Sequence, residues 1–175
     1  MKFQWIFIFC LLPSPLLAQA PIEEALLQQL TSPTLPSVQN QVLIQQEGIS
    51  HRATIVQIEA QRSQIQVQQV GEAHQVEIQQ QGQDNQWNIQ QEGERHQFTG
   101  TLYGDNNQVQ IQQFGQQNTI QQDLIGNGMD YSITQEGSQL ELIQIEYSPL
   151  APAYDVHQQG QGMTVIIEQG FSPNE

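Results

Sequence analysis

The chain has 175 residues, is rich in glutamine and carries a formal net charge of −14. This acidic balance excludes nucleic acid and anionic membrane surfaces as expected partners, because both are bound by basic patches. Glutamine-rich composition is typical either of disordered prion-like tracts or of ordered arrays with glutamine ladders. The apolar residues beyond residue 40 recur on a fixed register, which favours the ordered array.

Residues 1–20 are predicted to be a secretory signal peptide. Lys2 provides the positive start, residues 5–12 form the apolar run, and Ala18-Gln-Ala20 is a small-x-small cleavage site. The single cysteine, Cys10, lies inside this segment, so the exported chain would be held together without disulfides. No later segment is long enough to cross a bilayer. We therefore expect a secreted, extracellular protein with no membrane span after the signal peptide is removed.

Residues 21–39 differ in composition from the rest of the chain. The stretch 21–30 has a proline at its start, two glutamates and a weak stripe of leucines, which predicts at most a marginal helix. The following residues, 31–37, contain two prolines and several hydroxyl residues and are typical of a linker. We interpret residues 21–39 as an N-terminal leader and linker.

From Asn40 onward the sequence repeats every eleven residues. The copies open at Asn40, His51, Ser63, His74, Asn85, His96, Asn107, Asn118 and Met129. If the opening residue is position zero, positions two and four are mostly apolar, position six is usually Gln and position eight is usually Gly. The glutamines at position six are Gln46, Gln57, Gln69, Gln80, Gln91, Gln113 and Gln135. The glycines at position eight are Gly48, Gly71, Gly82, Gly93, Gly104, Gly115, Gly126 and Gly137.

This period predicts an all-β fold, a β-solenoid in which each unit buries its apolar face against its neighbours. Eleven residues make one strand and one corner, so two copies make a 22-residue rung of strand, arc and strand. The expected rungs are 40–62, 63–84, 85–106, 107–128 and 129–147, with a one-residue insertion in the first. The run Leu140–Tyr147 is expected to be a strand that is out of register. Residues 148–175 are either a loose tail or contain a degenerate sixth rung over 152–173.

Each template position should become a column of like residues about 4.8 Å apart. In a glutamine column every amide can donate to the next carbonyl and accept from the previous amide, which satisfies buried polar groups. The glycines should take positive φ at a tight arc. Asn85, Asn107 and Asn118 are expected to tolerate the left-handed region there and to bond the local backbone. Breaks in these columns, at Gly100, Leu102 and Leu124, predict weaker third and fourth rungs.

The repeat resembles that of curlin, the subunit of curli amyloid fibres. The core of that pattern, Gln-x-Gly-x2-Asn, is intact at Gln80–Asn85 and at Gln113–Asn118, and the resemblance covers roughly residues 40–147. It implies a subunit of an extracellular amyloid fibre that serves surface adhesion and the biofilm matrix, with copies of itself and other curlin-like subunits as partners. It also implies that residues 21–39 are an export tag read by an outer-membrane secretion pore. The irregular copies favour the minor, nucleating subunit slightly over the major, polymerising one.

The first rung opens directly after the proline-rich linker, so its strand edge is expected to be uncapped. An exposed edge that matches the protein's own repeat can template addition of another copy. The competing interpretation is a solenoid adhesin or binding module with capped ends that does not polymerise. No hydrolase, zinc-protease or phosphate-loop motif is found in the sequence, so we expect neither an enzyme nor a cofactor or metal site.

Three histidines, His51, His74 and His96, share the opening position in successive rungs. A column of imidazoles would be a candidate metal site or pH switch, because protonated rings would repel one another. The alternative is that His replaces Asn at a corner, as Asn118 indicates in the next rung. The second interpretation is favoured.

Overall fold

The computed structural model describes residues 40–147 and 153–170, so the predicted signal peptide and leader lie outside the described residues. The described residues form β-strands joined by short corners. The strands are β1 (Gln41–Ile49), β2 (Arg52–Gln61), β3 (Gln64–Glu72), β4 (Gln75–Gln83), β5 (Gln86–Glu94), β6 (Gln97–Tyr103), β7 (Gln108–Gln116), β8 (Thr119–Gln121), β9 (Leu124–Ile125), β10 (Asp130–Ser138), β11 (Glu141–Tyr147), β12 (Tyr154–Gln161) and β13 (Thr164–Gly170). Within residues 40–147 and 153–170 there is no helix long and apolar enough to span a membrane.

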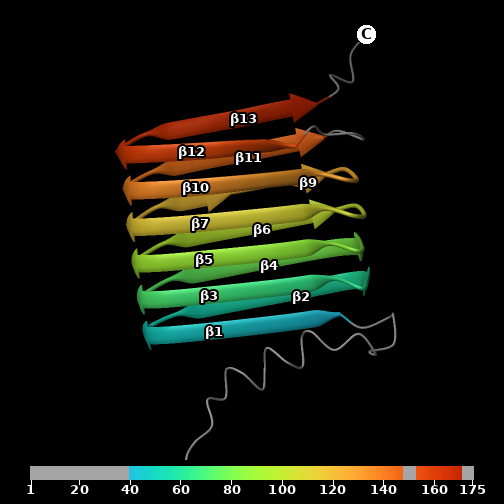
Figure 1. Cartoon of the computed structure of the whole chain (residues 1–175), viewed down its shortest axis with the longest axis horizontal. Coiled ribbons are helices and arrows are strands. Elements are labelled where there is room, and N and C mark those ends of the chain that lie inside the picture. Colours follow the sequence, from blue (N-terminus) through green and yellow to red (C-terminus); the bar gives the residue numbers. More distant parts are fainter. Residues whose placement is uncertain (1–39, 148–152, 171–175) are drawn as a thin grey trace, which may run out of the picture. The chain divides into compact units, whose positions relative to one another are not determined.

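Successive strands alternate between two parallel sheets, so each turn of the chain adds one strand to each sheet (Figure 1). Sheet A has the order β1-β3-β5-β7-β10-β12, and sheet B has the order β13-β11-β8-β6-β4-β2, with β9 between β6 and β11. Pairing runs in register along whole strands: Val67 of β3 lies beside Ile89 of β5, which lies beside Ile111 of β7. The predicted β-solenoid of 22-residue turns is confirmed.

The core is the thin layer between the two sheets, filled from positions two and four of each copy. Its fully buried apolar side chains include Ile65, Val67, Val76, Ile78, Trp87, Ile89, Phe98, Val109, Ile111, Ile120 and Ile133. Each such side chain contributes about 1.5–3 kcal/mol when it leaves water. Because every turn is too small to bury this face alone, its stability depends on the turns above and below.

Gly100, at a position that is apolar in most other copies, makes room for two large rings. The rings of Trp87 and Phe98 lie 5.9 Å apart between their centroids, at an angle of 57°. A Cβ atom on Gly100 would lie 2.6 Å from Cζ of Phe98 and 2.9 Å from Cη2 of Trp87. The missing side chain is thus replaced by aromatic volume in the third turn, where the sequence alone predicts a weakness.

A sixth turn is present. β12 pairs in parallel with β10, with Tyr154 beside Tyr131 and Gln158 beside Gln135. β13 pairs in parallel with β11 over its whole length. Of the two predicted alternatives for the C-terminal segment, the structure contains the degenerate sixth rung and not a loose tail.

The expectation that Leu140–Tyr147 is out of register is wrong. Leu142 of β11 lies beside Ile120 of β8, and the backbone N–H of Leu140 donates to Oδ1 of Asn118, 3.1 Å away. Leu140 therefore occupies the opening position one period after Met129. The run looks shifted in the sequence because its polar and apolar residues are exchanged between the two faces of the strand.

The extra residue of the first turn forms a β-bulge in β2. The register against β4 shifts between Ile58 and Gln61, and Glu59 takes a positive φ of 51°. Bulges accommodate a single inserted residue without breaking the rest of the ladder. The predicted insertion is thus absorbed locally, and the pairing of Arg52–Ile58 with β4 is undisturbed.

The left-handed residues are not the asparagines at the openings, as the sequence suggests, but the residues immediately before the openings. These have φ between 52° and 62° and are Ser50, Arg62, Ala73, Asp84, Arg95, Asn106, Gln117 and Gln139. Most of the opening residues, Asn85, Asn107 and Asn118 among them, have buried side chains, whereas Asn40 in the first turn is exposed. The corner therefore turns one residue earlier than predicted, which directs the opening side chain inward.

Candidate functional site

Sheet A contains a continuous ladder of glutamines, which are buried from Gln69 onward and exposed at Gln46. Nε2 of each glutamine donates to Oε1 of the glutamine one turn further along the chain, at 2.6–2.9 Å. The members in order are Gln46, Gln69, Gln91, Gln113, Gln135 and Gln158. All donations run in the same direction. The predicted ladder is present for its sheet A members, and it is extended by Gln158, whose place in the template is visible in the sequence through Tyr154, Val156 and Gly160.

The same amides also tie the two sheets together. From Gln69 onward, each Nε2 donates to a backbone carbonyl of sheet B, such as Gln75 O for Gln91 (3.3 Å) and Gln97 O for Gln113 (3.1 Å). Both N–H groups and the carbonyl of such an amide are therefore satisfied without water. A side chain with this set of partners is held in a single orientation.

The remaining predicted glutamines, Gln57 and Gln80, lie in sheet B and do not form a ladder. Oε1 of Gln80 accepts a hydrogen bond from Nε1 of Trp87, 2.9 Å away, and the next residue in its column is Leu102. Nε2 of Gln57 and Nε2 of Gln80 have no partner among the described residues. All these glutamines have the same template position in the sequence. Because successive copies alternate between the two sheets, they form two columns, and only the column in sheet A is joined by hydrogen bonds between amides.

The glycine positions bring backbones of neighbouring turns into close contact. A Cβ atom on Gly71, Gly93 or Gly115 would lie 2.0 Å from the carbonyl oxygen of the glycine one turn on. φ at the predicted glycines lies between 109° and 145°, a region that side chains rarely allow. Gly126 is the exception, since its φ is not positive. The glycines are needed for this contact as much as for the turn.

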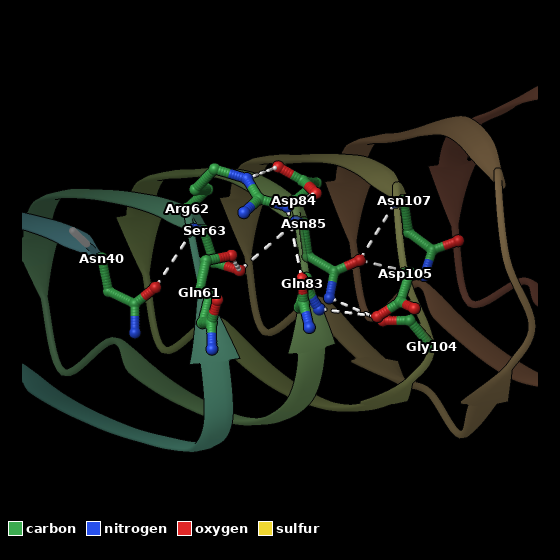
Figure 2. Close-up of polar contacts among 10 residues, drawn as sticks. All are labelled: Asn40, Gln61, Arg62, Ser63, Gln83, Asp84, Asn85, Gly104, Asp105 and Asn107. Carbon is green, nitrogen blue, oxygen red and sulfur yellow. Dashed lines mark hydrogen bonds and ion pairs between the residues drawn. The ribbon is translucent and has the colours of Figure 1, made fainter. Parts of the chain in front are cut away.

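The opening residues of sheet A strands form a second ladder, shown in Figure 2, which the sequence did not reveal. Each side-chain oxygen accepts the backbone N–H of the opening residue one turn further on: Asn40 from Ser63 (3.1 Å), Ser63 from Asn85 (3.3 Å), Asn85 from Asn107 (3.0 Å) and Asn107 from Met129 (2.9 Å). Nδ2 of Asn85 also donates to the carbonyl of Gly104, 2.7 Å away. The ladder ends at Met129, which has no acceptor to offer to the sixth turn.

On the outer surface of the same corner, Arg62 forms a bidentate ion pair with Asp84 one turn on. Nε lies 2.7 Å from Oδ1 and Nη2 lies 2.5 Å from Oδ2 (Figure 2). The guanidinium lowers the pKa of the Asp84 carboxyl through this hydrogen bond. Because both side chains are exposed, the pair contributes little to stability.

The histidines lie at the opposite corner, where their rings make the same backbone hydrogen bonds as an asparagine side chain. Nδ1 of His51, His74 and His96 accepts the backbone N–H of the next opening residue at 3.2–3.3 Å. Nε2 bonds the carbonyl four residues earlier, for example Val70 O for His74 and Glu92 O for His96, both at 2.9 Å. In the fourth turn Asn118 makes the equivalent pair, with Phe114 O and the N–H of Leu140. His is thus a replacement for Asn at this corner.

These contacts favour the neutral form of His74 and His96. The rings stack with centroids 5.0 Å and 4.9 Å apart, and Nδ1 must be unprotonated because it accepts an N–H. Burial lowers the pKa of His74 and lowers that of His96 to about 4, against the opposing effect of the carbonyl contacts. Since both ring nitrogens are engaged with the backbone, a metal ion would have to break a hydrogen bond of the corner.

We expect the described solenoid to lose stability in mild acid because of this column. A histidine whose pKa is lowered on folding binds protons first in the unfolded chain, so stability falls as pH drops below about 6.5 and continues to fall to about pH 4. The measurement is the urea midpoint at pH 7.5 and at pH 5. A His74→Asn/His96→Asn variant should keep its midpoint more nearly constant, and an unchanged pH response would contradict the assignment.

A polar cluster lies in the core of the last two turns. Oε2 of the buried Glu146 accepts the Tyr154 hydroxyl at 3.1 Å and Nε2 of Gln144 at 3.4 Å, and the Tyr131 hydroxyl donates to Gln122 at 3.3 Å. Burial and the neighbouring Glu146 raise the pKa of Tyr131 and of Tyr154, so both stay protonated donors. The aromatic rings stack 5.6 Å apart. In these C-terminal turns, hydrogen-bonded polar side chains therefore occupy part of the core that is apolar in the middle turns.

Taken together, the ladders of sheet A and of both corners repeat one set of contacts from turn to turn. Across residues 40–147 and 153–170, no three His, Cys, Asp or Glu side chains gather as potential metal ligands. The contact that repeats along the described residues is the edge-to-edge pairing of one turn with the next. No protein-family model matches the chain, and no curated protein matches it.

Proposed function

We propose that the protein is a secreted structural subunit of a curli-type amyloid fibre, built by end-to-end addition of copies, which serves cell-surface adhesion and the biofilm matrix. The observation that carries this proposal is the correspondence between the two outermost turns. Residues at the C-terminal edge have the same template positions as residues at the N-terminal edge, so one copy can continue the stack of another.

Both ends of the stack offer strand edges. Among the described residues, β1 and β2 pair on one side only, with β3 and β4, and β12 and β13 pair only with β10 and β11. Val42 and Ile44 of β1 are 46% and 42% exposed, whereas their equivalents Ile65 and Val67 are fully buried. An apolar strand edge of this kind favours addition of a further strand.

The two ends also match in chemistry. Continuing the stack would place Val42, Ile44 and Gln46 of an incoming copy on Tyr154, Val156 and Gln158. The glutamine ladder supports this head-to-tail order, because Gln158 has an N–H that can donate to Oε1 of the incoming Gln46. A head-to-head contact would bring two acceptors together. Cross-β stacking of identical registers is the basis of amyloid stability.

The C-terminal turns support the minor, nucleating subunit slightly more than the major one. Both corner ladders end in apolar residues, Met129 and Leu140, so neither corner of the fifth turn offers a side-chain acceptor to the sixth. A last turn that departs from the template suits a subunit that starts a fibre of another curlin-like protein. We further propose that residues 21–39 direct export through an outer-membrane pore and that the chain has no catalytic role.

The test is assembly after dilution from denaturant, followed by thioflavin fluorescence and electron microscopy. We expect fibres from the unmodified protein and none from an Ile44→Lys variant, because the charge would sit on the edge that must be covered. The matched control is Gln66→Lys, which places the same charge on the exposed outer face of β3. The control should assemble and both variants should keep the β-rich circular dichroism spectrum.

Two outcomes would contradict the proposal. A folded protein that stays monomeric under all conditions would favour the alternative, a solenoid adhesin that does not polymerise. Fibres from Ile44→Lys at the rate of the control would show that the N-terminal edge is not used. To separate the subunit types, small amounts of the protein should be added to a consensus curlin, whose lag should shorten if this chain is the nucleator.

A further inference from the structure

Strand β11 has its polar and apolar faces exchanged relative to the other long strands. Its inward residues after Leu142 are Gln144 and Glu146, both fully buried. Its outward residues are Ile143, Ile145 and Tyr147. Elsewhere the outward positions are mainly glutamine and threonine, as in β3, β5 and β6.

This exchange is unfavourable for the interior. Oε1 of Glu146 is buried and has no hydrogen-bond partner in the described part of the chain. A one-residue shift of a strand reverses both of its faces, and such a shift here would bury the two isoleucines and release the glutamate to solvent. The structure nevertheless keeps β11 in the register of its neighbours. The needs of the core therefore do not explain the apolar outer face.

Neighbouring strands extend this face into a larger surface. Ile125 of β9 and Ile166 of β13 lie on the strands that pair with β11, and Tyr103 of β6 lies one strand further, beside Ile125; the three side chains are 43%, 59% and 37% exposed. Tyr147 is 44% exposed and shares its template position with Tyr103 and Ile125. We define the outer patch as Tyr103, Ile125, Ile143, Ile145, Tyr147 and Ile166. Contiguous apolar surface of this kind marks an interaction site.

We propose that the outer patch binds the outer patch of a second copy in a neighbouring fibre, so that fibres associate side by side through sheet B. This inference rests on the proposed function, because it requires fibres. Six side chains provide less than the roughly 800 Å² per partner that a stable complex of two proteins usually buries. Single molecules are therefore expected to stay apart.

A fibre changes this balance because it presents the patch repeatedly. With six turns per copy and about 4.8 Å per turn, the patch would recur every ~29 Å on the same side of the stack. Once one pair of patches is in contact, the next pairs meet at high effective concentration. Association through sheet B is thus expected only after polymerisation.

The charges around the outer patch oppose pairing at low ionic strength. Asp123, Glu141 and Glu168 belong to the same sheet or its connection, and Asp123 Oδ2 accepts the Tyr147 hydroxyl at 3.4 Å. Residues 107–147 and 153–170 contain no lysine or arginine to balance them. Two identical patches would therefore repel at their rims, and added salt should promote bundling through screening.

The experiment compares unmodified fibres with Ile143→Thr/Ile145→Thr fibres by electron microscopy at low and moderate salt. The matched control, Gln66→Thr/Gln68→Thr, changes the equivalent outward positions of β3 in sheet A. Unmodified and control fibres should bundle more as salt rises, whereas the isoleucine variant should form single fibres with the same thioflavin kinetics. Its urea midpoint as a monomer should equal that of the unmodified protein.

Equal bundling of the isoleucine variant and the control would overturn the side-by-side contact. A large fall in the variant's urea midpoint would also overturn it, because it would mean that the isoleucines are buried in a shifted register. Unmodified fibres that remain single at every salt concentration would assign the patch to another partner and exclude a second fibre. Failure of the unmodified protein to form any fibre would instead refute the proposed function, and the inference with it.

Discussion

Replacing Gly93 by alanine is expected to cost about 3–5 kcal/mol of stability, the sum of a strained backbone and an overpacked contact. The new Cβ atom would lie 2.0 Å from the carbonyl oxygen of Gly115, and this oxygen belongs to the backbone and cannot rotate away. φ at Gly93 is 124°, which an alanine rarely adopts. Urea unfolding followed by circular dichroism should show the loss, and thioflavin kinetics should show a longer lag.

Gly128 provides the matched control. Its φ of 68° is close to that of Ala73 or Asp84 at the equivalent corner position, and nothing lies within 4 Å of a Cβ atom built on it. Gly128→Asn should therefore change the free energy of unfolding by less than about 1 kcal/mol, since asparagine tolerates the left-handed region. Equal losses at both sites would mean that the close contact between turns does not limit stability.

Replacing Gln91 by glutamate should be nearly as damaging, although the two side chains have the same shape. Nε2 of Gln91 donates to Oε1 of Gln113 at 2.8 Å and to Gln75 O at 3.3 Å, and a carboxylate would put oxygen against both acceptors. The site is fully buried, so the charge has neither water nor a cation to balance it. We expect a loss of about 3–5 kcal/mol at pH 7.

The pH dependence of this loss identifies its cause. Burial would raise the pKa of the new carboxyl in the folded chain, so the penalty should grow as pH rises above about 4.3, the value in the unfolded chain. Below that pH the protonated acid can donate to Gln113, so the part of the penalty that is due to charge should disappear, while the lost donation to Gln75 O remains. Gln86→Glu, on the exposed side of the same strand, is the control and should be close to neutral. A pH-independent loss would point to packing instead of charge.

The fold could be predicted from the sequence because the eleven-residue repeat determines where each strand and each corner lies. The template glutamines and glycines recur at a fixed spacing, and a period of eleven leaves one strand and one corner as the compact solution. Even the poorly matched C-terminal copies are revealed by Gln158 and Gly160. The glutamine ladder itself follows from hydrogen-bond chemistry once equivalent side chains are known to stack.

What could not be predicted depends on where a side chain points. The residue that opens most copies is polar and follows a corner, which predicts a turn residue, yet Asn107 and His96 are buried ladder members. The left-handed position is filled by residues as different as Ala73 and Arg95, which leaves no compositional signal. The register of β11 was predicted wrongly for a further reason. Its hydrophobic pattern indicates one register and the eleven-residue spacing indicates another, and the structure follows the spacing.

The uniform orientation of the sheet A amides has a consequence for the kinetics of the proposed assembly. Because every amide dipole points along the stack axis in the same sense, the dipoles add as peptide dipoles do in a helix, and each hydrogen bond polarises the next. A short column gains little from this mutual polarisation, while a long one gains with every amide added. Elongation should therefore become more favourable as the column lengthens, which makes initiation the slow step.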